Sequence, residues 1–236
     1  MNKIILVLTT LSAIAFSLSL ISCAGATSTE ADTLSPTIYY KPTVDADSEK
    51  CNRDEKVKMQ NSEGETLADL CPQDYNACLM QGSCFVRIQG RQHSFNVAAK
   101  NSHGYSFVEV DVTRCPYGYG VKNSCLDPYF SVAADLKYYN VGDVIYIPRL
   151  VGAVLPNGEV HDGFLIVRDQ GEGVQGPQRF DFFTGFYNHR AKENTLASLG
   201  FGERNNRFEF RKATEVEAEQ VREHRGYPGL NSERGE

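Results

Sequence analysis

Apolar and polar residues alternate along the middle of the chain with a period of two. Stretches such as "CFVRI" (84–88), "FSVAADL" (130–136), "GFLIVRD" (163–169) and "RFDFFTGF" (179–186) are rich in Val, Ile, Phe and Tyr, and Gly, Pro and Asn separate them. β-branched and aromatic residues in such short runs are typical of strands. Several short strands at close spacing favour a closed barrel or a sandwich, so the pattern predicts a mainly β domain over residues 66–212.

Helical patterns are few and short. Residues 66–80 contain Pro72 early, which suits the first turn of a helix. A second short helix is predicted over residues 190–200, where Gly200 can end it. We interpret residues 213–236 as a charged C-terminal tail that begins as a helix.

The N-terminal residues predict export. Lys3 precedes an apolar run that ends in "LISC", residues 20–23, and this order of apolar, apolar, small and Cys is the pattern of a lipoprotein cleavage site. We predict a lipoprotein signal peptide over residues 1–22 and a lipid anchor on Cys23. Ala24 follows this cysteine, and no Asp stands at that position. In this respect the sequence resembles Gram-negative lipoproteins that are anchored in the outer membrane and face the periplasm. The alternative is an ordinary signal peptide in which Cys23 occurs by chance. In that case the protein would be secreted.

Residues 23–65 are mostly small and polar, with prolines in their first half. Such a composition is typical of flexible linkers, because it offers little apolar surface to bury. The sequence therefore predicts a flexible tether that holds the β domain away from the membrane.

The cysteine count also fits an exported chain. There are 7 cysteines, and without Cys23 an even number remains, which predicts three disulfides. The sequence does not select their pairing. A zinc site is the weaker alternative, because no CxxC pair is present and the five histidines are scattered. The cysteines predicted to pair are Cys51, Cys71, Cys78, Cys84, Cys115 and Cys125.

Charge excludes one class of partner. The formal net charge is −6, and no basic block follows the signal peptide, so nucleic acid is not an expected partner. No metal ion or organic cofactor is implied, and we expect a monomer.

The stretches "FSVAADLKYYNVGDVIYIPRL" and "GFLIVRDQGEGVQGPQRFDFFTGF" resemble the C-terminal barrel of the membrane-bound lytic transglycosylase A family and the related 3D domain. That domain is named for three aspartates, which match Asp135, Asp169 and Asp181 here. The resemblance covers residues 81–212 and implies a six-stranded double-psi β-barrel. The family carries a large second domain before the three-aspartate segment. Only residues 111–129 fill that place in this sequence, which predicts that the long sugar groove is missing.

The resemblance implies cleavage of peptidoglycan glycan strands by a single acid. Asp181 would protonate the glycosidic oxygen and then, as a base, help the sugar's own 6-hydroxyl to close a 1,6-anhydro ring. Asp169 would raise the pKa of Asp181 or bind sugar, and Asp135 would support them. Burial beside aromatic residues or a second carboxylate would keep such an acid protonated. The alternative for Asp135 and Asp169 is that they cap turns.

Other residues could contact sugar, because aromatic faces stack on sugar rings. The candidates lie after the Asp181 strand and on the loop that the last two cysteines frame, and ordinary loop packing is the alternative for each. The "HDG" at 161–163 is interpreted as a turn, since neighbouring residues on an extended chain point apart. The candidates are Tyr187, His189, Tyr117 and Tyr119.

Three functions follow from these observations. The first is a lytic transglycosylase that cleaves the MurNAc–GlcNAc bond of peptidoglycan and is attached to the membrane by a lipid anchor. The second is a wall-binding or wall-loosening module without turnover, which the missing second domain favours. The third is a hydrolase in which Asp169 acts as a second carboxylate.

Overall fold

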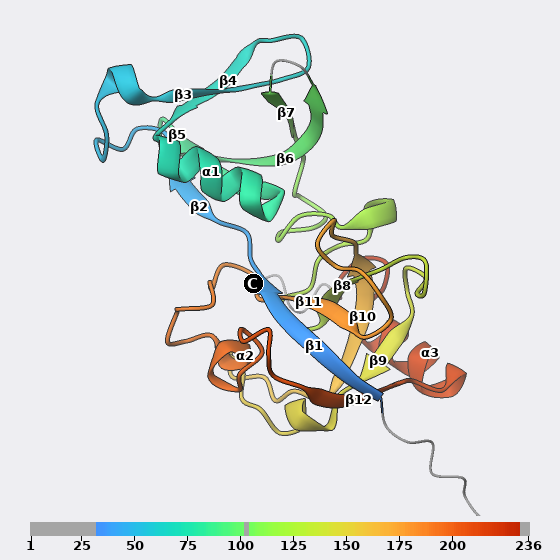
Figure 1. Ribbon diagram of the computed structural model, residues 1–236. Coiled ribbons are helices and arrows are strands. Elements are labelled where there is room, and N and C mark those ends of the chain that lie inside the picture. The colour runs from blue at the N-terminus through green and yellow to red at the C-terminus, as the bar shows by residue number, and fades with distance from the viewer. Residues whose placement is uncertain (1–31, 102–103, 232–236) are drawn as a thin grey trace, which may run out of the picture. The chain divides into compact units, whose positions relative to one another are not determined.

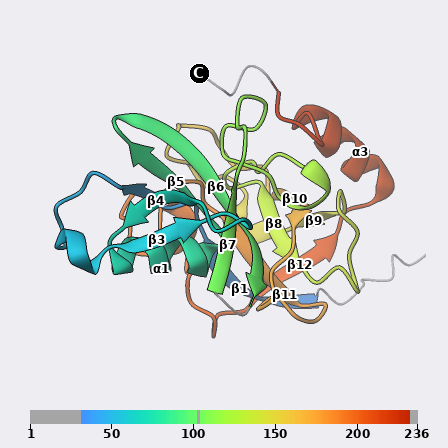
Figure 2. The same ribbon diagram turned by 90° about the horizontal axis from the view of Figure 1, so that it is seen from above.

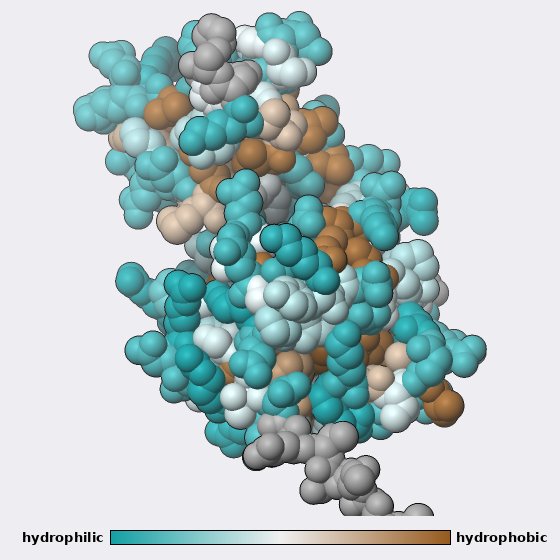
Figure 3. Space-filling model, turned by 45° about the vertical axis from the view of Figure 1, so that its right-hand side comes forward, coloured by the Kyte–Doolittle hydropathy of each residue, from teal (hydrophilic) through white to brown (hydrophobic). Residues whose placement is uncertain are grey.

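The computed structural model describes residues 32–101 and 104–231 (Figure 1). The predicted signal peptide and the predicted lipidation site, Cys23, lie outside the described residues. Within the part of the chain that the structure describes, no helix is long and apolar enough to cross a membrane. Polar residues cover most of the face seen in Figure 3, and apolar residues appear there in separate patches.

Six strands close into a barrel, which confirms the predicted mainly β fold. Around the barrel the order is β1, β11, β8, β10, β9 and β12. Strands β1 and β11 pair in parallel, as do β8 and β10, and the other neighbours are antiparallel. The bounds are β1 Asp32–Tyr39, β8 Ser131–Ala134, β9 Val144–Tyr146, β10 Phe164–Asp169, β11 Arg179–Phe183 and β12 Phe208–Lys212.

The apolar positions of the alternating runs point into this barrel. Phe180 and Phe182 of β11 are fully buried, as are Leu165 and Val167 of β10, and all four belong to one core cluster. Burial of a large apolar side chain stabilises a fold by about 1.5–3 kcal/mol, so these strands are held in one register. The residue between the two phenylalanines, Asp181, therefore lies on the outer face of the barrel wall.

A second six-stranded sheet is inserted in the chain between β1 and β8, and Figure 2 shows it from above. Its order is β2, β5, β6, β7, β3 and β4. Met59, Phe95 and Phe107 form a core of its own, to which helix α1 contributes Cys78. The bounds are β2 Thr43–Asp45, β3 Val57–Gln60, β4 Thr66–Leu70, α1 Pro72–Gln81, β5 Ser83–Ile88, β6 Arg91–Asn101 and β7 Gly104–Glu109.

The prediction of a flexible tether over residues 23–65 is wrong for residues 32–65. This part of the chain forms β1, β2 and β3. Despite its polar composition, this segment buries apolar side chains: Leu34 lies in the barrel core, and Val44 and Met59 lie in the core of the second sheet. Strand β1 pairs with both β11 and β12, so the barrel closes only with this segment.

The boundaries predicted for the barrel, residues 66–212, are wrong at their N-terminal side. Residues 66–109 belong to the second sheet instead. A second unit therefore does precede the three-aspartate segment, contrary to the prediction that only residues 111–129 fill that place. Alternation alone could not separate the two sheets, since strands of both show the same period of two.

The C-terminal segment, predicted as a charged tail over residues 213–236, is folded over its described part. Helix α3, Glu215–His224, packs Ala218 and Val221 against apolar residues of β9 and β10. Arg225 follows the helix and is only 2% exposed. The remaining short elements are the helix α2 Thr195–Ser198 and the 3-10 turns Arg53–Glu55, Val121–Asn123 and Pro148–Leu150.

The six predicted cysteines form three disulfides. Cys51 pairs with Cys71 beside the start of α1, and Cys78 at its end pairs with Cys84 of β5. The third bridge closes the loop that precedes β8. This pairing required the structure, because an even number of cysteines does not say which of them are partners. The third bridge joins Cys115 and Cys125.

We predict that no free thiol appears when an oxidised Cys23→Ser chain is denatured without reductant. Six thiols should become titratable after reduction, because the three bridges contain all six remaining cysteines. Each lost bridge should lower the free energy of unfolding by roughly 2–4 kcal/mol. Thiol titration and a peptide map of the oxidised chain measure this, and two or more thiols before reduction would contradict the pairing.

Candidate active site

Asp169 and Asp181 lie on either side of the same residue of β8. Asp181 of β11 and Asp169 of β10 both pair with Ala133, so the two carboxyl groups face the same side of the barrel wall. A register shift between Val167 and Asp169 makes this possible. Without the bulge, Asp169 would share the core-facing side of Val167, because alternate residues of a strand point to one side.

Strand β1 supplies the nearest partner of Asp181. The Thr37 hydroxyl donates to Asp181 Oδ1 at 2.7 Å, and Arg179 Nη2 donates in turn to Thr37 Oγ1 at 2.6 Å. Burial raises the pKa of Asp181, while the Thr37 hydrogen bond and the Arg179 charge oppose that rise. The outcome is a half-buried carboxyl group with a raised pKa.

Asp169 is held by more donors than Asp181. Its Oδ2 accepts from the Tyr39 hydroxyl at 3.2 Å, and its Oδ1 accepts from the Gln170 N–H at 2.9 Å. The backbone N–H of Val121 acts in the same direction as these two donors and lowers the pKa of Asp169. Burial is the largest influence and raises the pKa of Asp169 to about 6, and the nearby charge of Asp181 adds to the rise.

The sequence analysis missed four residues of this site: Thr37, Tyr39, Arg179 and Gly120. The signal for the first two was the run "LSPTIYY", in which Thr37 and Tyr39 stand two residues apart, as on one face of a strand. Gly120 brings the loop backbone so close to β10 that a Cβ there would lie 2.2 Å from the Arg168 carbonyl oxygen. No feature of the sequence alone indicated that contact.

Asp135 lies just after β8 and bonds to loop backbone. Its two carboxylate oxygens accept from the N–H of Lys137 at 3.0 Å and of Gly176 at 2.8 Å. These two bonds, that of Gly176 first, lower the pKa of Asp135. The Asp135 side chain thus connects the glycine-rich loop after β10 to the end of β8. This geometry fits the alternative that Asp135 caps a turn better than a role beside the carboxyl pair.

Two of the four predicted sugar-contacting residues come together. Tyr117 and Tyr187 line a cavity of about 260 Å³, together with Tyr129 and Phe186, and the Tyr117 and Phe186 rings lie 5.5 Å apart. The carboxyl pair is not part of the lining of this cavity. The other two candidates lie elsewhere: His189 is exposed, and Tyr119 pairs with Cys125 through its backbone.

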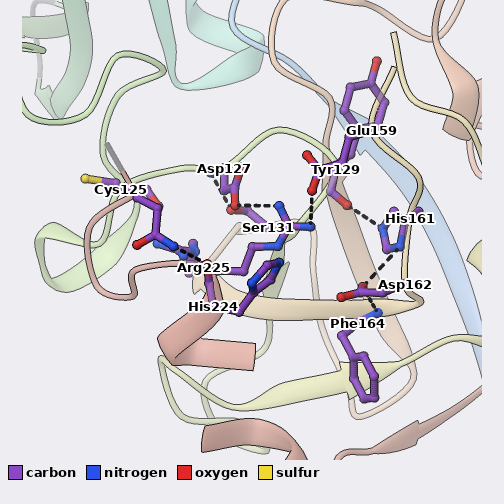
Figure 4. A network of polar contacts seen from close by, with 12 residues as sticks. Cys125, Asp127, Tyr129, Ser131, Glu159, His161, Asp162, Phe164, His224 and Arg225 are labelled. Carbon is purple, nitrogen blue, oxygen red and sulfur yellow. Dashed lines mark hydrogen bonds and ion pairs between the residues drawn. The ribbon is translucent and has the colours of Figure 1, made fainter. Parts of the chain in front are cut away.

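The "HDG" segment bends at Gly163 just before β10, and its histidine is buried. His161 is 1% exposed, and its ring stacks on Phe130 at 4.5 Å. Nε2 lies 2.9 Å from the Tyr129 carbonyl (Figure 4), and Nδ1 accepts from the Gly163 N–H at 2.8 Å. One nitrogen donates and the other accepts, so the ring is neutral and serves the structure.

A metal centre has no support in the described ranges 32–101 and 104–231, because no three His, Cys, Asp or Glu side chains come together there as ligands.

The segment that contains the pair matches a known family. Residues 130–195 match the 3D domain. This segment includes Asp135, Asp169 and Asp181, the three aspartates for which the sequence analysis recognised the domain. No curated protein matches the chain in sequence.

The fold is similar to that of MltA lytic transglycosylases. The structure of Escherichia coli MltA with bound chitohexaose matches with a TM-score of 0.55 and 14% sequence identity, over 77% of this chain and 72% of that chain. A membrane-bound lytic murein transglycosylase from Agrobacterium tumefaciens matches with a TM-score of 0.50 and 15% identity, over 80% and 76%. The likeness thus extends beyond the 3D domain, and at this identity it concerns the fold.

Proposed function

We propose that the protein is a lytic transglycosylase that cleaves the MurNAc–GlcNAc bond of peptidoglycan. The observation that carries this proposal is the carboxyl pair on the outer barrel wall, where both pKa values are raised. Support comes from the 3D domain and from a fold shared with MltA, whose structure holds an oligosaccharide. The sequence resemblance and the geometry of the site point to the same two aspartates.

The reaction needs one proton and no water. In its acid form, Asp181 donates its proton to the glycosidic oxygen as the bond from that oxygen to C1 of MurNAc breaks. The resulting Asp181 carboxylate then takes the proton of the 6-hydroxyl of the same MurNAc. The O6 oxygen forms the new bond to C1, which closes the 1,6-anhydro ring and returns Asp181 to its acid form.

Asp181 suits the acid role better than Asp169 because its carboxyl group is less restrained. Asp169 accepts hydrogen bonds from Tyr39 and Gln170, and the loop backbone at Gly120 lies close to its Cβ. The pKa of about 6 for Asp169 does not decide the roles, since two interacting carboxyl groups titrate as a pair and their apparent pKa values belong to both. In this assignment the role of Asp169 is electrostatic: its nearby carboxyl group helps the carboxyl pair to retain one proton. Tyr117 and Tyr187 contact sugar.

The wall-binding alternative has lost its main support. It rested on a missing second domain, and the structure has a second sheet in that place in the chain. Mass spectrometry of soluble products from purified sacculi tests all three functions. Anhydro-muropeptides support the proposal, products with a free reducing end would indicate the hydrolase, and binding to sacculi without release would indicate the wall-binding module.

We predict that kcat/KM for cleavage is highest near or below pH 6 and falls above it. The reaction starts from a pair that holds a proton, and the pKa of Asp169 is about 6, so a rise in pH removes that proton. The fall should approach about tenfold for each pH unit. Initial rates of product release between acidic and alkaline buffers measure this, and a rate that rises steadily through pH 8 would contradict it.

We also propose that Cys23 carries a lipid anchor and that the protein lies at the outer membrane, facing the periplasm. The "LISC" pattern supports this. We predict that Cys23→Ser moves the protein from the detergent phase to the aqueous phase in Triton X-114 partitioning, because the thioether to the lipid cannot form. Wild-type protein that already partitions to the aqueous phase would rule out the anchor.

A further inference from the structure

The pairing of β1 with β11 brings two pairs of polar residues together on the outer face of the barrel wall (Figure 1). Ser35 lies opposite Arg179, and Thr37 lies opposite Asp181. Because alternate residues of a strand point to the same side, Arg179 and Asp181 share the face that is turned away from the core. Strand β1 thus supplies neighbours for the candidate acid and for the arginine two residues before it.

The Arg179 guanidinium is held in one orientation by backbone carbonyl groups of two strands. Its Nη1 donates to the Phe180 carbonyl of β11 at 2.7 Å and to the Ser35 carbonyl of β1 at 3.0 Å. A guanidinium is planar and its donors form a rigid fork, so these two bonds also determine where Nη2 points. Nη2 donates to Thr37 Oγ1 at 2.6 Å, and the hydrogen-bonded connection from Arg179 to Asp181 therefore runs through Thr37.

The Thr37 hydroxyl has one hydrogen, and its two contacts decide where this hydrogen points. A guanidinium can only donate, so Thr37 Oγ1 accepts from Arg179. The hydroxyl hydrogen then serves the second contact, with Asp181 Oδ1 at 2.7 Å. If the proton of the Asp181 acid were on Oδ1, Thr37 would have to accept twice, and its own hydrogen would have no acceptor among the described residues. Thr37 therefore donates to Oδ1 whether Asp181 is ionised or protonated.

The second oxygen of Asp181, Oδ2, is the one that a substrate can reach. In the described part of the chain no donor makes a hydrogen bond of normal geometry to Oδ2, and Oδ2 is not one of the buried polar atoms that lack a partner. It is therefore open to solvent. The two oxygens of this carboxyl group thus differ, because one is occupied by a protein donor and the other is accessible.

We propose that Arg179 is a positioning residue for the acid: it fixes the Thr37 hydroxyl as a donor to Oδ1, so that the transferable proton of Asp181 is held on Oδ2. The proposal rests on the proposed function, because it concerns the same acid. Oδ2 donates this proton to the glycosidic oxygen and afterwards takes the proton of the 6-hydroxyl. The reaction therefore begins and ends with the proton on the same oxygen, and Arg179 and Thr37 act only through Asp181.

Infrared difference spectroscopy of the full chain tests where the proton lies. At acidic pH, the carboxylic acid band that Asp181→Asn removes belongs to Asp181. Thr37→Val removes the donor to Oδ1 and retains the shape of the side chain, so the C=O stretch of this band should move to higher frequency. The control Thr37→Ser retains the hydroxyl and should leave the band in place. A band that Thr37→Val does not move would overturn the proposal, because the carbonyl oxygen would then be Oδ2.

Steady-state kinetics with soluble glycan strands test the role of Arg179. Thr37→Val and Arg179→Met should each lower kcat about tenfold with little change in KM, because one hydrogen bond that orients the acid is lost. Adding Arg179→Met to Thr37→Val should lower kcat by at most about twofold more, since residues that act through one another are not additive. The matched control is Arg207→Met, which removes a positive charge that lines the same cavity of about 300 Å³ as Arg179 and should leave kcat unchanged.

Losses of kcat that simply multiply in the double variant, or an equal loss in Arg207→Met, would overturn the role of Arg179. Thermal unfolding shows whether each variant is folded, and the band shift in Thr37→Val carries the test if Arg179→Met does not fold. If the wild-type chain releases no anhydro-muropeptides, the proposed function fails, while the infrared band still decides which oxygen of Asp181 holds the proton.

Discussion

Asp181→Asn should abolish the release of anhydro-muropeptides from sacculi. The amide retains the size of the carboxyl group and can still accept from Thr37, which donates to Asp181 Oδ1 at 2.7 Å, but it has no proton to transfer. General acid–base catalysis by one residue contributes roughly 10²–10⁴-fold. Because the same residue acts first as acid and then as base, the loss of kcat should lie at or beyond the upper end of that range.

Folding and sugar binding should survive this substitution, since Asp181 lies on the outer face of the wall and its neighbours Phe180 and Phe182 form the core. Thermal unfolding and binding of a chito-oligosaccharide measure both. Asp169→Asn is the matched control and should reduce cleavage less, because its proposed effect is electrostatic. If Asp169→Asn is the more damaging change, the roles of the two aspartates must be exchanged. A near wild-type rate in Asp181→Asn would reject the assignment.

Arg225→Met should cause the largest loss of stability among single substitutions in the C-terminal segment. The guanidinium lies between two carboxylates, 3.6 Å from Asp127 and 3.0 Å from Glu159 (Figure 4), and it also covers the Phe130 ring. Its side chain is 2% exposed. Removing the cation leaves two carboxylates in a largely buried place without this partner, and breaking such a buried pair costs about 3–5 kcal/mol.

Urea unfolding at neutral pH measures this loss. Arg211→Met is the matched control, because Arg211 also pairs with a carboxylate, Glu217, at 2.7 Å, but its side chain is 42% exposed. Exposed pairs contribute only about 0–1 kcal/mol, so Arg211→Met should change the free energy of unfolding much less. Equal losses for the two variants would mean that burial does not set the strength of the Arg225 contacts.

Much of the barrel and its chemistry could be predicted from local sequence. Strands β8, β10 and β11 follow from short runs of β-branched and aromatic residues that Gly, Pro and Asn separate, because such side chains favour strands. The raised pKa of Asp181 was anticipated from its phenylalanine neighbours, and burial is indeed its largest cause. The even number of cysteines after Cys23 predicted three disulfides, since the count depends on composition and not on the fold.

The closure of the barrel depended on tertiary structure. Strand β1 looks like a linker in sequence, and only its pairing with β11 and β12 brings Thr37 and Tyr39 to the carboxyl pair. The second sheet shares the alternation of the barrel, so its separate core could not be read from the period. Contacts between segments more than a hundred residues apart leave no local pattern, because neither partner alone has to be apolar or regular.

The position of Asp169 shows most clearly what the sequence determines and what only the tertiary structure decides. The sequence placed it at the end of a strand, and simple alternation would have turned it towards the core with Leu165 and Val167. A register shift beside Arg168 turns it to the face of Asp181 instead. A bulge depends on how the neighbouring strand pairs and on what the extra residue can reach, and here Arg168 reaches the Cys125 and Gly229 carbonyls. The sequence thus determined which side chains are available, and the packing of distant segments decided which of them face one another.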